Sequence, residues 1–307
     1  MTTMVPIIDF DACSLARSKV ASDRLPELAR SLLKSLSVDG VVILKNHGID
    51  EKEIRSAFDL SDEFFRSPAD NKLLFEAKSE DNFKIGYAHS GTERYSRVKN
   101  FREAFRLRPG THSTIDTVVP GFVKAQQLLF TSMGKLVQRL VRLLAIGLEI
   151  DENVFTDKFK KMGEEGNSSY MMHNWYTTEQ SFDKSGEAIR LFGHFDNSAL
   201  TLLVTSKHPG LQFRNREGEW SDVPPSGDNI IVLIGQIMEA WTEDKLKAPF
   251  HRVTFPERDQ GTDNRMSCAF FAIPDNAHTI CSIHGSEKYP PFKPDVFFVD
   301  KLNVLYK

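Results

Sequence analysis

The stretch GHFDNSALTLL, Gly193–Leu203, decides the fold, because it places two polar side chains directly before an apolar run. In a β-strand, residues i and i+2 point to the same side, so His194 and Asp196 should project together while Phe195 points the other way. A buried carboxylate without a partner is costly. A metal ion would compensate Asp196 and use His194 as a second ligand. We therefore expect a buried strand that begins with metal ligands.

A third ligand and an anion-binding pair follow later in the chain. His251 lies in KAPFHRVTF, which is another strand pattern. Two histidines and one carboxylate with open coordination positions form the facial triad of non-haem Fe(II) oxygenases. Arg265 and Ser267 stand at i and i+2 in RMSCAFF, so they should share a strand face. An inward arginine beside a hydroxyl can receive a carboxylate through charge-assisted hydrogen bonds.

Composition excludes several other classes of protein. The chain has 307 residues, 40% of them hydrophobic, and a net charge of −3. We expect no nucleic-acid partner, because there is no global basic field. We expect no membrane association, because no apolar run approaches the roughly 18 residues that a span requires. Three cysteines without a pairing pattern and no secretory signal indicate a cytoplasmic protein, and we expect a monomer.

The hydrophobic period changes once along the chain. Residues 1–110 combine helices and short strands, and residues 111–167 carry a supporting helix of about 25 residues that starts after Pro120. Its apolar face should include Val123, Leu128 and Leu129. Residues 168–275 show short strands separated by turns, which is typical of a β-sandwich or barrel. Residues 276–307 form a C-terminal tail that closes this core, so we expect one structural domain.

Several short motifs, in order and spacing, resemble one enzyme family over nearly the whole chain. They are VPIIDF, GVVILKNHGI, DEFFRSPADNK, GYAHSG, NFREAF, HNWY, HFDNSALTLL, KAPFHRV and NRMSCAFFAIP. The chain resembles the isopenicillin N synthase-like branch of Fe(II)/2-oxoglutarate dioxygenases. The resemblance implies an α+β fold with a double-stranded β-helix, or jelly roll, wrapped by helices.

The resemblance also implies a set of site residues and a reaction. Fe(II) would be held by His194, Asp196 and His251, while Arg265 and Ser267 would bind the distal carboxylate of 2-oxoglutarate. The Asn and the second Tyr of the family's N-Y-Y motif, which also touch the co-substrate, correspond to Asn174 and Tyr176. The reaction would consume O2 and 2-oxoglutarate, release succinate and CO2, and oxidise an unactivated C–H bond by hydroxylation, desaturation or ring closure. HFDNSALTLL and KAPFHRV are more similar to the cephalosporin ring-expanding, deacetoxycephalosporin C synthase-like branch than to plant flavonoid or hormone oxygenases.

Candidate residues for the prime substrate come from less specific patterns. The segment ERYSRVKNFREAFRLR is basic, and Arg102 and Arg106 share a face if the strand runs through Ala104. Either could meet a carboxylate on a small-molecule substrate, although a solvated strand face explains the same pattern. Phe195, where the family often has Thr, and His284 in the tail are further candidates. His173 adjoins Asn174 but should point away from it, so we expect a structural role.

Two other functions remain open on the sequence alone. One is an iron oxidase of the isopenicillin N synthase type that uses no 2-oxoglutarate and lets the Arg-x-Ser pair hold the substrate's carboxylate. The other is a non-catalytic binding module on the same fold. Asn174 and Tyr176 favour a bound co-substrate over the first, and the complete set His194, Asp196 and His251 argues against the second.

Overall fold

The computed structural model describes residues 4–18, 20–78, 81, 85–92, 94–95, 98–99, 102–176, 181–182, 188–255 and 264–305. Within this part, the larger sheet has eight strands in the order β1-β2-β13-β10-β15-β7-β6-β3. Their bounds are β1 Ile7–Asp9, β2 Val41–Lys45, β3 Gly86–Ala88, β6 Arg102–Leu107, β7 Tyr170–Tyr176, β10 Leu200–Thr205, β13 Ile230–Ile234 and β15 Arg265–Ala272. Except for the parallel pair β1 and β2, neighbouring strands are antiparallel.

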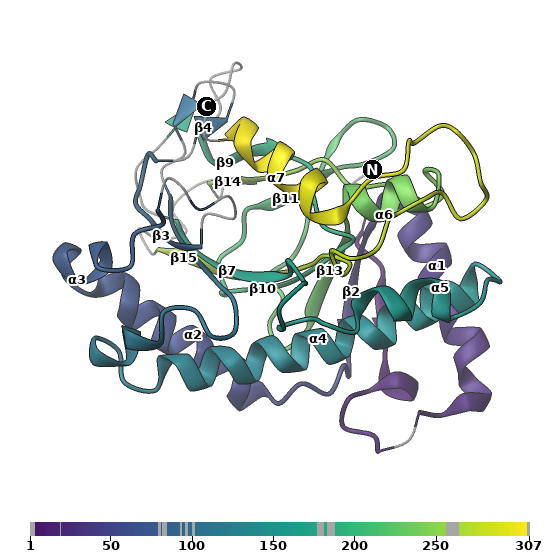
Figure 1. Cartoon of the computed structure of the whole chain (residues 1–307), viewed down its shortest axis with the longest axis horizontal. Coiled ribbons are helices and arrows are strands. Elements are labelled where there is room, and N and C mark those ends of the chain that lie inside the picture. The colour runs from purple at the N-terminus through teal and green to yellow at the C-terminus, as the bar shows by residue number, and fades with distance from the viewer. Residues whose placement is uncertain are drawn as a thin grey trace.

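A smaller sheet lies across from the larger one (Figure 1). Its strand order is β12-β11-β14-β9-β8, and its strands are β8 Ser181–Phe182, β9 Ala188–His194, β11 Leu211–Arg214, β12 Trp220–Asp222 and β14 His251–Thr254. A separate hairpin pairs β4 Arg94–Tyr95 with β5 Val98–Lys99. From β9 to β15 the chain passes repeatedly between the two sheets. This alternation is the double-stranded β-helix, which confirms the predicted α+β jelly-roll fold.

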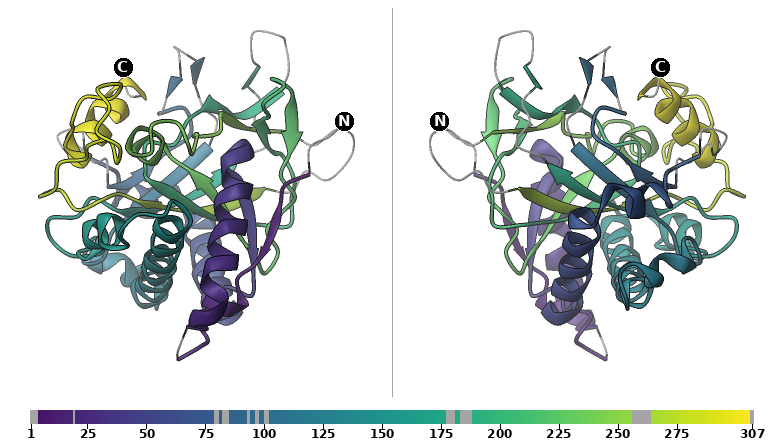
Figure 2. Two further views of the ribbon diagram at one scale, coloured as in Figure 1. Left: turned by 90° about the vertical axis from the view of Figure 1, so that its right-hand side faces the viewer. Right: turned by 90° about the vertical axis from the view of Figure 1, so that its left-hand side faces the viewer.

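Helices α1, α2 and α4 lie along the outer side of the larger sheet, as views from two opposite sides show (Figure 2). The bounds of the helices in the described part of the chain are α1 Leu25–Asp39, α2 Glu51–Arg66, α3 Ala69–Leu73, α4 Phe122–Gly147, α5 Asn153–Thr156, α6 Gln236–Trp241 and α7 Pro294–Leu305. Short 3-10 turns span Asp11–Cys13, Ser22–Arg24, Ser113–Thr117 and Asp157–Phe159. Helix α1 is capped at its C-terminal end by Gly40, whose φ of 73° is the left-handed conformation that glycine adopts most readily. Among the described helices, none combines the length and the apolarity needed to cross a membrane.

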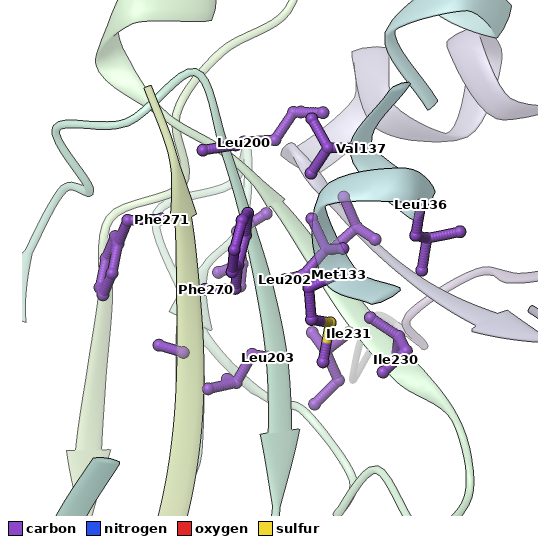
Figure 3. Close-up of a cluster of buried hydrophobic side chains, with 14 of the residues drawn as sticks. Met133, Leu136, Val137, Leu200, Leu202, Leu203, Ile230, Ile231, Phe270 and Phe271 are labelled. Carbon is purple, nitrogen blue, oxygen red and sulfur yellow. The ribbon is translucent and has the colours of Figure 1, made fainter. Parts of the chain in front are cut away.

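The supporting helix predicted after Pro120 is α4, and it packs on the larger sheet (Figure 3). Figure 3 shows Met133 and Val137 of α4 on the side that faces Leu200 and Leu202 of β10, and these side chains and Leu136 are fully buried. Burying one such side chain contributes roughly 1.5–3 kcal/mol. The prediction was wrong for Leu128, which is 50% exposed, because it lies outside the stripe of α4 that faces the sheet.

The stretch 193–203 is not one strand, which corrects the sequence interpretation. Strand β9 ends at His194 in the smaller sheet, and β10 begins at Leu200 in the larger sheet. Asp196 lies in the crossing between them, and Leu200 and Leu202 pack towards α4 rather than continuing the face of His194. The alternation rule fails here because it holds only within a single extended strand. The crossing itself brings the polar residues to one end of the barrel.

Candidate metal centre

The structure brings His194, Asp196 and His251 together at one end of the barrel. The Nε2 atoms of both histidines lie 3.7 Å from Asp196 Oδ1. One ligand atom from each residue falls within 4.8 Å of the others. Metal–ligand bonds of about 2.1 Å allow two ligands of one ion to stand at most about 4.2 Å apart. The two contacts to Asp196 are therefore compatible with a shared ion, as the donor set of a facial triad requires.

Strand pairing and backbone carbonyls fix the two imidazoles. His251 of β14 is directly paired with His194 of β9. The Nδ1 of His194 lies 2.9 Å from the carbonyl oxygen of Phe192, and the Nδ1 of His251 lies 3.1 Å from that of Pro249. Because a carbonyl only accepts, each Nδ1 carries the proton and each Nε2 keeps its lone pair. In metalloproteins, hydrogen-bond acceptors of this kind orient the histidines that bind the metal.

The charge states of His194 and Asp196 favour the binding of a cation. Burial, followed by the neighbouring His251, lowers the pKa of His194 to about 3. The imidazole is therefore neutral at neutral pH, as metal ligation requires. Asp196 is only 5% exposed, and its ion-pair contacts among the described residues are with the two histidines. A divalent ion would supply the positive charge that this buried carboxylate lacks.

A second group of polar residues crosses three neighbouring strands of the larger sheet. In one row, Arg102 of β6, Tyr176 of β7 and Arg265 of β15 are paired side by side. In the next row, Ala104, Asn174 and Ser267 are paired in the same way. Arg102 Nη1 donates to Asn174 Oδ1 at 2.6 Å, and Asn174 Nδ2 donates to Ser267 Oγ at 3.4 Å. Asn174, Tyr176, Arg265 and Ser267 thus lie in one buried patch.

Arg265 has unused hydrogen-bonding capacity inside the protein. It is 1% exposed, its guanidinium lies 5.0 Å from the Tyr176 ring, and its Nε and Nη1 have no hydrogen-bond partner among the described residues. Burial lowers the pKa of Arg265, yet an arginine stays protonated at neutral pH. Buried N–H groups are normally satisfied, so these orphaned donors indicate a missing acceptor.

The metal-binding end and Arg265 lie at opposite ends of β15. The crossing that carries Asp196 meets the far end of this strand, where the Ala199 N–H donates to the Ala272 carbonyl oxygen at 2.9 Å. Arg265 begins the strand. Residues 265, 267, 269 and 271 share the side of β15 opposite Phe270, whose ring packs on Phe130 of α4 at 4.8 Å. A ligand that contacts both the triad and Arg265 must therefore extend along the barrel interior.

The proposed substrate residues lie in different places. Arg102 and Arg106 are buried and share one face of β6, as the predicted register requires. Phe195 is 40% exposed, and its ring lies 5.0 Å from that of Phe250. His284 is exposed, and its N–H donates to Ser282 Oγ at 3.3 Å. Arg97, in the same basic segment, lies outside the described residues.

The sequence interpretation missed two features of the barrel interior. One is an aromatic cluster in which Tyr170 stacks on Phe271 at 4.6 Å and lies 5.3 Å from Phe298 of α7. The other is Arg190, a buried arginine in the strand AIRLFGH. A charged residue inside an apolar strand was a usable signal for Arg190. No local pattern could reveal that α7 packs against Tyr170.

Comparisons with known proteins agree with this architecture. Residues 168–274 match the 2OG-Fe(II) oxygenase superfamily, and residues 5–118 match the family described as non-haem dioxygenase in morphine synthesis N-terminal. The 2-oxoglutarate-dependent dioxygenase frbJ of Dothideomycetidae sp. (strain 11243) is 30% identical over 282 residues, which covers 87% of this chain and 73% of frbJ. Proline hydroxylase buaE of Petromyces alliaceus is 25% identical over 271 residues, covering 83% of each protein.

A solved structure supports the fold. A full-length Neurospora crassa protein in complex with alpha-KG superposes with a TM-score of 0.82 and 24% identity, covering 97% of this chain and 96% of the Neurospora chain. The likeness to the cephalosporin ring-expanding branch stays a prediction, since these proteins do not test it. Family membership, however, follows directly from the matches. The chain belongs to the 2OG-Fe(II) oxygenase superfamily and is a 2-oxoglutarate-dependent dioxygenase, an oxidoreductase that uses Fe(II) and 2-oxoglutarate.

Proposed function

We propose that this dioxygenase oxidises an unactivated C–H bond of a small, carboxylate-bearing metabolite in specialised metabolism. The observation that carries the proposal is the arrangement of two sites along one barrel interior. His194, Asp196 and His251 stand at one end, and the orphaned donors of Arg265 stand at the other. This arrangement suits a chelating co-substrate with a second carboxylate.

The triad residues are assigned to the metal. His194 and His251 would supply imidazole nitrogen, and Asp196 would supply carboxylate oxygen, leaving three coordination positions open. When bound, Fe(II) supplies the redox chemistry that couples oxidative decarboxylation of 2-oxoglutarate to oxidation of the substrate. The protein's own contribution is to keep His194 neutral through burial and to orient both imidazoles through the carbonyl groups of Phe192 and Pro249.

The co-substrate is assigned to the patch around Arg265. Arg265 would donate from Nε and Nη1 to the distal carboxylate, and Ser267 would add its hydroxyl. Hydrogen bonds to a charged group contribute about 1.5–3 kcal/mol each. Tyr176 would hold Arg265 in place through its ring, and Asn174 would orient Ser267. The pre-formed network reduces the entropy lost on binding.

The prime substrate is assigned to the metal end of the barrel interior. Tyr170 and Phe271 stand at that end, and Phe298 of α7 closes over Tyr170. Arg106, paired with Met172 on β7, is nearer to this end than Arg102, which bonds to the co-substrate residue Asn174. Arg106 is therefore the preferred anchor for a substrate carboxylate. The related proline hydroxylase, whose name denotes an amino acid substrate, supports a small substrate that carries a carboxylate.

Succinate release tests the proposal. The protein is supplied with Fe(II), O2 and 2-oxoglutarate, and small carboxylic acids are compared with their amides or methyl esters. We expect an acid to increase succinate formation and its uncharged counterpart to have little effect. Equal stimulation by both members of a pair would contradict a carboxylate-bearing substrate. Substrate oxidation without succinate formation would instead favour the oxidase alternative.

A further inference from the structure

Arg190 is a buried cation that the site described above does not use. It lies in β9, the strand that ends at His194, and is 4% exposed. Its guanidinium stands 4.6 Å from the Phe255 ring centre, so one face is covered by an aromatic surface. Its Nε and Nη1 have no hydrogen-bond partner among the described residues. The ring covers the flat face of the guanidinium but does not accept in-plane N–H bonds, so these donors still lack an acceptor.

A structural arginine in the same protein looks different. Arg139 of α4 reaches across to the segment after the first strand, and its Nη1 donates to the backbone carbonyl oxygens of Cys13 and Ser14. Its contacts are complete without any ligand at that nitrogen. Arg190 differs from Arg139, because it is buried like a core residue but lacks the hydrogen-bond acceptors that a buried arginine normally has.

The charge of Arg265 acts on Arg190 although the two residues belong to different sheets. Arg190 belongs to the smaller sheet and Arg265 to the larger one. Desolvation and then the positive charge of Arg265 lower the pKa of Arg190 to about 10. Among the described residues, the electrostatic partners that affect these two guanidinium groups include Tyr176 and no Asp or Glu. Two neighbouring buried cations without a counter-ion are costly, so the arrangement lacks an anion.

We propose that Arg190 is a second cationic anchor for the distal carboxylate of 2-oxoglutarate, acting from the side opposite Arg265. The inference rests on the proposed co-substrate site. A carboxylate has two oxygens with about four acceptor positions, so it can be bound from two sides at once. Arg265 with Ser267 would occupy one side, and Nε and Nη1 of Arg190 the other. The pair would select 2-oxo acids with a second carboxylate against those with an uncharged end.

The test measures binding selectivity rather than turnover. Isothermal titration calorimetry of Fe(II)-loaded protein under nitrogen compares 2-oxoglutarate with 2-oxopentanoate, in which a methyl group replaces the distal carboxylate. The variants are Arg190→Met and Arg190→Lys, and the control is Arg214→Met, an exposed arginine of the same sheet. The ratio of interest is the affinity for 2-oxoglutarate divided by the affinity for 2-oxopentanoate. We expect Arg190→Met to lower this ratio about 10- to 100-fold, because the variant loses a charge-assisted contact to the distal carboxylate. Arg190→Lys should restore part of it.

Each other outcome has a distinct meaning. If Arg190→Met weakens both ligands equally, the residue acts only through general stability, and the proposal is wrong. It is equally wrong if the ratio is unchanged in Arg190→Met while Arg265→Met lowers it. If the unmodified protein does not bind 2-oxoglutarate, the proposed co-substrate site itself fails, and the role of Arg190 with it. The ratio stays informative in a partly destabilised variant, because both ligands are measured on the same folded fraction.

Discussion

His194 and His251 are directly paired on the antiparallel strands β9 and β14, and the Nε2 atom of each lies 3.7 Å from Asp196 Oδ1. The two histidines are far apart in the sequence but adjacent in the smaller sheet. Asp196 joins them because the chain leaves β9 at His194 and crosses towards β10. A metal centre thus arises from one strand pair and one crossing.

Replacing the carboxylate should remove the metal without harming the fold. Asp196→Ala is expected to weaken Fe(II) binding by about 100-fold or more. This loss exceeds the roughly 10–100-fold loss that is typical when a residue hydrogen-bonded to a metal ligand is replaced. The metal-free protein should lose no thermal stability, because a buried carboxylate without a cation is unfavourable. Anaerobic calorimetry and a melting curve measure both effects, and the exposed Asp222→Ala is the matched control. Unchanged iron affinity would remove Asp196 from the site.

Replacing Arg265 should weaken the binding of the co-substrate and leave the binding of the metal nearly unchanged. Arg265→Ala is expected to weaken 2-oxoglutarate binding about 10- to 100-fold or more, since it removes charge-assisted hydrogen bonds. Iron binding should change less than about twofold because Arg265 begins β15, away from the triad. Arg265→Lys should be intermediate, because lysine keeps the charge but loses the planar fork. Equal loss of iron and co-substrate would show that the division of roles is wrong.

Gly193 should be required for the alignment of the two histidines. A Cβ at this position would stand 2.5 Å from Cζ of Phe250. That ring has little freedom, because it packs between Phe195 at 5.0 Å and Trp220 at 5.8 Å. Phe250 precedes His251, so Gly193→Ala should displace the ligand strand and reduce iron affinity about tenfold. Gly134→Ala is the control for a glycine substitution without a clash, because the nearest atom to an added Cβ there is 3.8 Å away.

Acid should destabilise the metal-free protein partly through His173. Burial lowers the pKa of His173 to about 3, against 6.5 for an exposed histidine. Between these values the unfolded chain binds the proton and the folded chain does not, so stability falls as pH drops below about 6.5. The slope approaches about 1.4 kcal/mol per pH unit for one such group. Urea unfolding of the protein and of His173→Gln from pH 7 to 5 measures the slope of stability against pH, which should be smaller in His173→Gln by about one proton.

Arg106 should determine affinity for the prime substrate. Once an acid that stimulates succinate release is known, Arg106→Met should raise its KM about tenfold or more and leave 2-oxoglutarate binding within about twofold. The reason is its position next to Met172, towards the metal end of β6. The uncharged amide of the same acid should respond little to the change. A rise in the 2-oxoglutarate requirement instead would place Arg106 with the co-substrate.

Sequence alone predicted the fold class, which depends on local signals, and the grouping of His194, Asp196 and His251, which the family resemblance implied. The change of period near residue 168 predicted the barrel, and the long apolar stripe after Pro120 predicted α4. The arrangement around Asp196 was mispredicted, since a strand pattern does not show where a chain changes sheets. Phe298 was missed because its contact with Tyr170 forms only by tertiary folding, whereas Arg190 was missed although a charged residue inside an apolar strand was a usable signal.

The most direct measurement follows succinate by mass spectrometry during aerobic incubation with Fe(II) and 2-oxoglutarate. It compares the unmodified protein with Asp196→Ala and Asp222→Ala, each shown to be folded by circular dichroism. We predict iron-dependent succinate in the unmodified protein and in Asp222→Ala, and none above background in Asp196→Ala. Undiminished succinate in folded Asp196→Ala would contradict the claim that this carboxylate and its two histidines hold the reactive iron.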